Sequence, residues 1–185
     1  MTSIEAKPAA DGILPVQELN ACFKKGFISS ATEMEKHQIQ PASLDLRLGR
    51  RAWRIQASFL PGINQTVQDK IEKFAMYPLD LSDGAVLETG CVYIVELQER
   101  LALPPGLSAL ANPKSSTGRL DVFTRLITDG AIEFEAVAEG YNGPLYAEIS
   151  PRTFSVKVRQ GSRLSQLRLR RGQHSLDDAE LTLSQ

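Results

Sequence analysis

Short runs of alternating or apolar residues, broken by turn-forming residues, constrain the fold of this chain more than any other feature. In the first run, Leu44, Leu46 and Leu48 alternate with Asp45 and Arg47, which is the period of a strand with one face buried and the other in water. Later runs are separated by Gly, Pro, Asn or Asp and cover residues 91–97, 145–149, 154–158 and 164–169. This succession predicts a mainly β fold of the sandwich, barrel or jelly-roll type.

Two segments have helical spacing instead, so a few short helices are expected. The first lies between Pro15, which suits a first helical turn, and Gly26, which suits a C-terminal stop; its apolar residues are Val16, Leu19 and Phe23. In the second, within residues 65–75, the apolar residues recur every three or four positions: Val67, Ile71 and Phe74.

The length of 185 residues is enough for one sizeable core. We find no internal repeat and no Pro, Ser or Gly-rich linker that would divide the chain. We therefore expect one β domain over residues 13–185, preceded by a flexible arm over residues 1–12, which has no apolar periodicity.

Composition narrows the class of protein. Hydrophobic residues make up 42% and charged residues 23% of the chain, which is ordinary for a globular protein and argues against disorder. A net charge of -1 argues against a nucleic-acid-binding surface. No apolar run is long enough for a membrane span, and the first residues lack a secretory signal. We expect a cytoplasmic protein with no membrane partner.

A local basic cluster stands near the C-terminal end: Arg163, Arg168, Arg170 and Arg171. Because Arg168 and Arg170 alternate with leucines, we interpret them as the solvated face of a strand. Arg163 could also line a phosphate-bearing cleft.

The chain is poor in zinc ligands. Its only cysteines and histidines are Cys22, Cys91, His37 and His174. Zinc-dependent nucleoside deaminases need a His or Cys with Glu and a Pro-Cys-x-x-Cys set, so no zinc site is expected. We interpret the cysteines as buried free thiols and the histidines as surface or structural residues.

Residues 112–120 combine hydroxyls with cationic side chains directly after an apolar strand. If Ser115 or Ser116 caps a short helix running through Val122, the free backbone N–H groups there form an anion site, with Lys114 adding charge. A triphosphate would fit such a site. A plain capped helix explains the same pattern.

A glycine-rich turn feeds the strand that follows, in residues 139–149. Alternation places Tyr146 and Glu148 on the face opposite the apolar residues. Spacing alone favours a solvent-facing Glu148. A carboxylate in a closed cleft could instead have a raised pKa and act as a general base.

Together these segments resemble the deoxycytidine triphosphate (dCTP) deaminases, which share a superfamily with the trimeric dUTPases. The resemblance runs from about residue 39 to 169 and follows the order QPASLDLRLG, KSSTGRL, GYNGPLYAEIS and GSRLSQLRL. Arg119 lies four residues after Ser115, and Glu148 lies five after Gly143, as in that family's catalytic set. The implied fold is a distorted jelly-roll or β-clip-like barrel.

The resemblance also implies a chemistry without a catalytic metal. Water held near Ser115 would be activated by Glu148 and attack C4 of cytosine, giving dUTP and ammonia in pyrimidine deoxynucleotide metabolism, while Arg119 orients Glu148. The expected substrate-binding residues are Lys114, Ser115, Ser116, Arg119, Tyr141 and Gln166. Mg²⁺ would be bound through the substrate triphosphate, and the assembly would be a homotrimer or a pseudo-trimer.

Three departures from the family pattern leave alternatives open. Lys114 stands where the family usually has Arg, the run after Arg119 is longer and more acidic than the usual His-Val-Thr-Ala-like run, and the closing tail is not recognisable after Leu169. Some relatives carry two halves in one chain, and this chain would suit the N-terminal half. The alternatives are a dUTPase-like diphosphohydrolase, with Asp129 or Glu139 placing the water, and a non-catalytic half-domain that binds nucleotide or supports a trimer.

Overall fold

The computed structural model describes residues 11–172 and confirms the mainly β fold. The strands are β1 (Gly12–Ile13), β2 (Ile28–Ser30), β3 (Ile39–Gln40), β4 (Ser43–Ile55), β5 (Ala75–Asp80), β6 (Ala85–Leu87), β7 (Val92–Ala102), β8 (Leu107–Pro113), β9 (Val122–Thr128), β10 (Ala136–Val137), β11 (Asn142–Pro151), β12 (Val156–Val158) and β13 (Arg163–Arg171). The helices are α1 (Val16–Lys24), α2 (Val67–Phe74) and α3 (Ser115–Arg119). Of the arm expected over residues 1–12, the first ten lie outside the described residues, and Gly12 belongs to β1.

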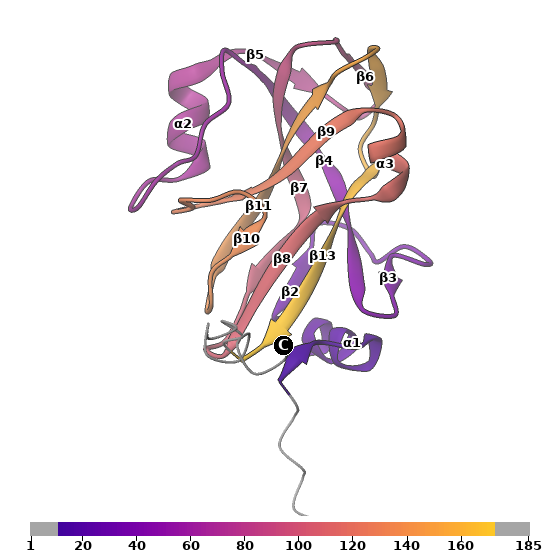
Figure 1. The fold of residues 1–185 in the computed structure, drawn as a ribbon, viewed down its shortest axis with the longest axis vertical. Helices are drawn as coiled ribbons and strands as arrows, with labels where there is room; N and C mark the ends of the chain where they lie inside the picture. The colour runs from indigo at the N-terminus through magenta and orange to yellow at the C-terminus, as the bar shows by residue number, and fades with distance from the viewer. Residues whose placement is uncertain (1–10, 173–185) are drawn as a thin grey trace, which may run out of the picture.

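The long strands form one antiparallel sheet in the order β10-β8-β13-β4-β7-β11-β9, which curls into a nearly closed barrel (Figure 1). Glu135 joins its two edges. The Ala111 N–H donates to the Glu135 carbonyl at 2.8 Å, and the Glu135 N–H donates to the Leu126 carbonyl at 3.0 Å. Ala111 lies on β8 and Leu126 on β9, so a single residue of the segment between β9 and β10 links the two sides.

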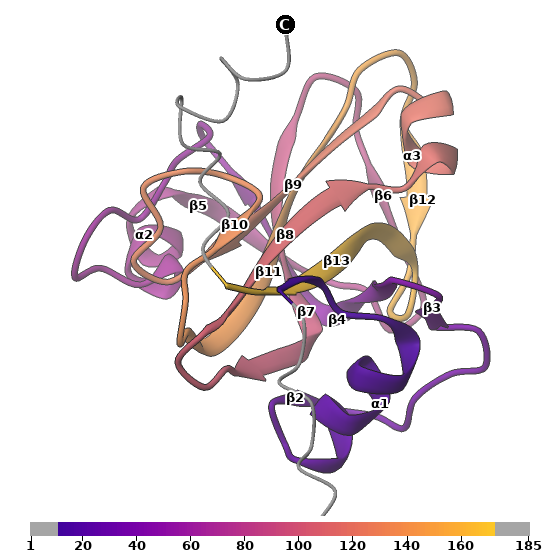
Figure 2. The same cartoon turned by 60° about the horizontal axis from the view of Figure 1, so that its bottom comes forward.

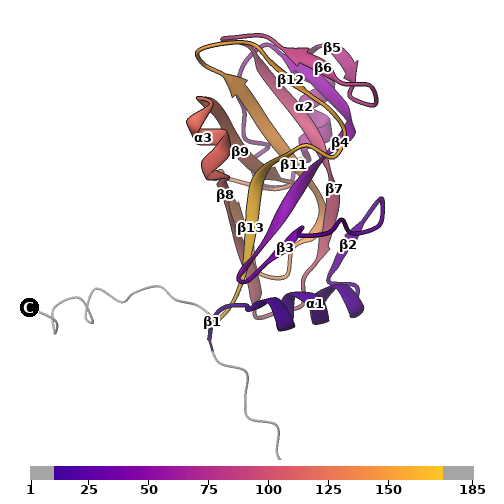
Figure 3. The same cartoon turned by 90° about the vertical axis from the view of Figure 1, so that its right-hand side faces the viewer.

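The helices lie on the outside of this barrel. Helix α1 crosses one end, beside β3 (Figures 2 and 3), and buries Leu19 and Cys22. Helix α2 lies beside the other half, where the side chain of Thr66 and that of Asp69 cap each other's backbone N–H groups. Both helices match the segments predicted from apolar spacing.

Two hydrophobic clusters stabilise the sheet from opposite faces. The larger one fills the barrel and includes Leu44, Leu46, Leu145, Ala147 and Ile149. The smaller one lies between the sheet and α2; its buried members are Ile55, Val67, Ile71, Ile94, Ile127 and Tyr146. Because β11 contributes to both clusters, both of its faces are covered.

The prediction of a wet face on β4 is wrong. Asp45 and Arg47 are 2% and 1% exposed. The guanidinium of Arg47 donates to Glu99 at 2.8 Å and also to Ser30 and Thr32. A buried charge is tolerated when it is paired and hydrogen-bonded in this way.

The predictions for the cysteines and for a membrane span can also be compared with the structure. Both cysteines are free, but only Cys22 is buried, whereas Cys91 is half-buried at the start of the β7 run. Within residues 11–172, no helix is long and apolar enough to cross a membrane.

Candidate active site

The cationic segment after β8 forms α3, although not as predicted. Neither serine caps the helix: Lys114 is the extended residue before it, and Ser115 and Ser116 are its first two residues. The helix ends at Arg119, with Leu120 as its C-cap, and the chain turns into β9 through Asp121, whose φ is 51°. The side chains of Ser115, Ser116 and Arg119 are exposed, so all three face outward from one short element.

The buried carboxylate of Asp45 lies next to two cationic side chains, those of Lys114 and Arg163. The ammonium of Lys114 forms an ion pair with Oδ2 of Asp45, and the guanidinium of Arg163 lies 3.7 Å from the same oxygen. Gln166 is the cross-strand partner of Asp45, and its Oε1 accepts a hydrogen bond from Ser43. The structure therefore brings Lys114 and Gln166 together around Asp45, with Arg163 beside them.

The other arginines of the basic cluster differ in their exposure and in their partners. Arg168 is exposed, as predicted, but Arg170 is half-buried and donates to Ser108 at 3.0 Å. Arg163 also pairs with Glu35, and this hydrogen bond lowers the pKa of the Glu35 carboxyl. Arg163 is thus held between two carboxylates.

Glu148 is buried, which corrects the solvent-facing interpretation. Its residue exposure is 1%, because β11 lies between β7 and β9 in the sheet. Oε1 accepts two hydrogen bonds from Arg125, from Nε at 3.2 Å and from Nη2 at 2.5 Å. Oε2 is buried and has no hydrogen-bond partner among residues 11–172. One carboxylate oxygen is therefore fixed and the other is left with free acceptor capacity.

Arg125 was missed at the level of sequence. It is the direct cross-strand partner of Glu148, and opposite charges at such a position attract each other. In the sequence, Arg125 is the one charged residue within 122–128. Its pairing with Glu148 could be inferred only with knowledge of the strand register. Arg119, which the family resemblance assigns to Glu148, makes no hydrogen bond or ion pair with it in the described part of the chain.

The guanidinium of Arg125 is held from several sides. It donates to the Ser58 hydroxyl at 2.9 Å and lies 3.5 Å from the ring centroid of Phe134 and 4.7 Å from that of Phe123. Contacts of this kind combine cation–π attraction with stacking of the planar group. The Arg125–Glu148 pair is consequently fixed by its surroundings.

The predicted substrate residue Tyr141 lies in the turn before β11. Its hydroxyl donates to the Pro144 carbonyl at 2.6 Å and accepts from the Asp129 N–H at 3.2 Å. Burial raises the pKa of Tyr141, so the hydroxyl stays protonated. A Cβ at Gly143 would lie 2.5 Å from that hydroxyl, which explains the glycine. No hydrogen bond joins Tyr141 to Glu148 in the described structure.

The two carboxylates considered for a diphosphohydrolase both bind backbone. Asp129 accepts from the Val67 N–H at the start of α2, at 2.7 Å. Glu139 accepts from the Gly106 N–H, also at 2.7 Å. Each carboxylate therefore has a structural partner in this chain.

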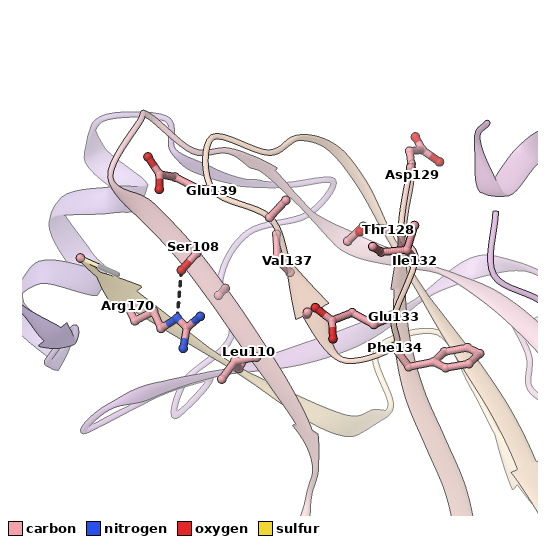
Figure 4. Close-up of a pocket in the computed structure, with 16 residues that line it drawn as sticks. Ser108, Leu110, Thr128, Asp129, Ile132, Glu133, Phe134, Val137, Glu139 and Arg170 are labelled. Atoms are coloured by element: carbon pink, nitrogen blue, oxygen red, sulfur yellow. Dashed lines mark hydrogen bonds between the residues drawn. The ribbon is translucent and has the colours of Figure 1, made fainter. Parts of the chain in front are cut away.

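A cavity of about 540 Å³ lies beside β8 and the segment between β9 and β11 (Figure 4). Arg170, bonded to Ser108, stands at one side and Phe134 at the other. Phe134 lines the cavity and also stacks on Arg125, so one ring contacts both the cavity and the cation that binds Glu148. This segment is the one that departs from the family pattern.

The described residues, 11–172, contain no group of three or more His, Cys, Asp or Glu side chains placed to hold a metal ion. The carboxylate that binds the cationic segment is Asp45, whose Oδ2 pairs with Lys114 and lies 3.7 Å from Arg163.

Comparison with known proteins gives a consistent result. The family model of the 2'-deoxycytidine 5'-triphosphate deaminase (DCD) N-terminal domain matches residues 10–173. A dCTP deaminase of Halorubrum lacusprofundi is 33% identical over 132 residues, which is 70% of this chain and 62% of that protein. A dUMP-forming dCTP deaminase of Halobacterium salinarum is 32% identical over 114 residues, 61% of this chain and 55% of that protein.

A solved structure is also similar. The 2'-deoxycytidine 5'-triphosphate deaminase of Agrobacterium tumefaciens has a TM-score of 0.87 and 54% sequence identity, and the match covers 95% of this chain and 52% of that one. The chain thus spans about half of the Agrobacterium protein and less than two thirds of the two archaeal relatives.

Proposed function

This chain belongs to the dCTP deaminase N-terminal domain family, and from that membership we propose that it converts dCTP and water into dUTP and ammonia, with Glu148 as the base. The observation that carries the proposal is the state of Glu148: a buried carboxylate with Oε1 held by Arg125 and Oε2 without a partner. A general base needs such a free lone pair within reach of the proton that it removes.

The proposed reaction begins with a water near Ser115. Oε2 of Glu148 accepts one proton from this water while the water oxygen bonds to C4 of the cytosine ring, and the C4–N3 double bond becomes single as Glu148 passes this proton to N3. The remaining proton of the new C4 hydroxyl then passes through Glu148 to the amino group, the C4–N bond to that group breaks, and ammonia leaves as the C4 carbonyl forms. Arg119 would orient the reacting groups, as the family resemblance implies, and its exposed position on α3 leaves it free to do so.

The triphosphate would be bound by the cationic segment. Lys114, Ser115 and Ser116 supply an ammonium and two hydroxyls, and Gln166 lies beside Asp45 on the neighbouring strand. Since Asp45 already pairs with Lys114, Mg²⁺ would be carried by phosphate oxygens and not by this carboxylate. Tyr141 would contribute to substrate binding by fixing the conformation of the turn before β11, through the hydrogen bond from its hydroxyl to the Pro144 carbonyl.

A trimeric assembly would bring α3 of one subunit next to Glu148 of another. Glu148 is paired on β11 with Arg125 of β9, whereas α3 ends before β9 begins. The side chains of Ser115, Ser116 and Arg119 are exposed and form no hydrogen bond or ion pair with Glu148 within residues 11–172. They would therefore be available to the Glu148 of a neighbouring subunit.

One competing function has support of its own. Because the chain spans only 52% of the similar Agrobacterium protein, it could be a half-domain that binds nucleotide without turning it over. The diphosphohydrolase alternative is weaker, because Asp129 and Glu139 both bind backbone N–H groups.

Product analysis separates these functions. The purified chain is incubated separately with dCTP and Mg²⁺ and with dUTP and Mg²⁺; ammonia, pyrophosphate and the nucleotide products are measured, and dCTP binding is measured on the same protein. We expect ammonia and dUTP from dCTP and no pyrophosphate from dUTP. Pyrophosphate from dUTP would establish a diphosphohydrolase, and bound dCTP without ammonia would establish the non-catalytic half-domain.

A further inference from the structure

We propose that Arg125 is a positioning residue for Glu148: it holds Oε1 and thereby directs Oε2 toward the reacting water. This inference rests on the function proposed above and adds a residue that the family resemblance did not supply. It is carried by three features of the described structure, namely the asymmetry of the ion pair, which leaves one oxygen free, the anchoring of the guanidinium and the position of Arg125 in the sheet.

The first feature is the asymmetry of the ion pair. Nε and Nη2 of Arg125 both bind Oε1, at 3.2 and 2.5 Å, although Arg and a carboxylate commonly form two parallel bonds with two different oxygens. An ion pair with a purely structural role gains most from satisfying both oxygens. Here Oε2 is left buried without a partner, which is costly unless another group uses that oxygen.

The second feature is that Arg125 cannot easily move to the other oxygen. Ser58 accepts from the same Nη2, at 2.9 Å. The ring of Phe134 lies 3.5 Å from the guanidinium carbon and that of Phe123 lies 4.7 Å from it. A planar group bound by a hydroxyl and two rings is fixed in orientation as well as in position, and so is the carboxylate that it binds.

The third feature is the position of Arg125 in the sheet. It faces Glu148 directly across the β9–β11 pair, and its side chain is 25% exposed while that of Glu148 is 2% exposed. Arg125 is therefore the more exposed partner of the pair, and it binds the carboxylate from the neighbouring strand.

The test compares four proteins in the ammonia assay: the unchanged chain, Arg125→Gln, Arg125→Lys and the control Arg152→Gln. Arg152 also lies over Phe123, at 5.1 Å, but forms no ion pair among the described residues. We expect Arg125→Gln to lower kcat about 100-fold, as misplacement of a catalytic group does, with KM changed less than about threefold. Arg125→Lys should recover part of kcat, and Arg152→Gln should leave it unchanged.

A stability cycle of Arg125→Gln, Glu148→Gln and the double variant tests the ion pair without reference to activity. We expect the melting temperature of the double variant to be no lower than that of the worse single variant, since both remove the same interaction. If Arg125→Gln kept the kcat of ammonia release, or lowered kcat/KM only by raising KM, this inference would be overturned while the proposed function would stand. No ammonia from the unchanged chain would overturn the proposed function, and additive melting shifts would then overturn the ion pair as well.

Discussion

At the scale of single residues, Glu135 combines two unusual properties. Its backbone, at a φ of 69°, links β8 to β9, a conformation that a non-glycine residue adopts rarely and at some energetic cost. Burial raises the pKa of its carboxyl from 4.5 to about 7, although a backbone hydrogen bond and the nearby Arg125 oppose the rise. Oε2 is buried without a partner in the described structure. The residue that joins the barrel edges therefore carries a carboxyl that folding keeps partly protonated near neutral pH.

This property predicts a pH-dependent gain from Glu135→Gln. The raised folded-state pKa stabilises the protein below the unfolded pKa of 4.5, and this contribution is lost as pH rises toward 7. Glutamine does not titrate. We expect the variant to be more stable than the unchanged chain at pH 8, by about 1–2 kcal/mol after allowance for partial solvent access, with most of this gain absent at pH 5.

Urea unfolding at the two pH values measures this difference, and Glu133→Gln, at an exposed neighbour, is the matched control. An equal effect of Glu135→Gln at pH 5 and pH 8 would contradict the assignment of the raised pKa to Glu135.

At the scale of elements, α2 is linked by a hydrogen bond to a segment that is distant in the sequence, the one that follows β9. Thr66 and Asp69 satisfy two N–H groups at its start, and Asp129, from the segment after β9, satisfies that of Val67. The spacing of its apolar residues predicted this helix because amphipathicity is local. The contact with Asp129 spans 62 residues, so no local pattern could indicate it.

The role of Asp129 at α2 predicts a loss of stability with no direct loss of catalysis. Asp129→Ala should lower the free energy of unfolding by about 1 kcal/mol, the usual effect of removing a helix cap. Asp129→Asn should lower it less, because the amide oxygen can still accept from Val67. Denaturant unfolding of both variants checks this order. If both variants instead lost pyrophosphate release from dUTP while staying folded, Asp129 would be a catalytic residue of a diphosphohydrolase.

At the scale of the whole molecule, the sequence predicted what depends on local order and missed what depends on long-range pairing. The β-rich fold and the family followed from strand periodicity and the order of motifs, and both are confirmed. Asp45 and Glu148 were assigned to wet faces because their partners are remote: Lys114 lies 69 residues from Asp45, and Arg125 lies 23 residues from Glu148. The barrel that buries these carboxylates is also what brings their cations to them.

The measurement that tests the central claim most directly is ammonia release from dCTP by Glu148→Gln, with dCTP binding measured on the same sample. Glutamine keeps the shape of the side chain and can still bind Arg125 through its amide oxygen, but it is a very weak proton acceptor. We expect binding within about threefold of the unchanged chain and a loss of ammonia release of about 1,000-fold or more, within the range seen for essential acid–base residues. Ammonia release at the unchanged rate from a variant that binds dCTP would contradict the assignment of Glu148 as the base.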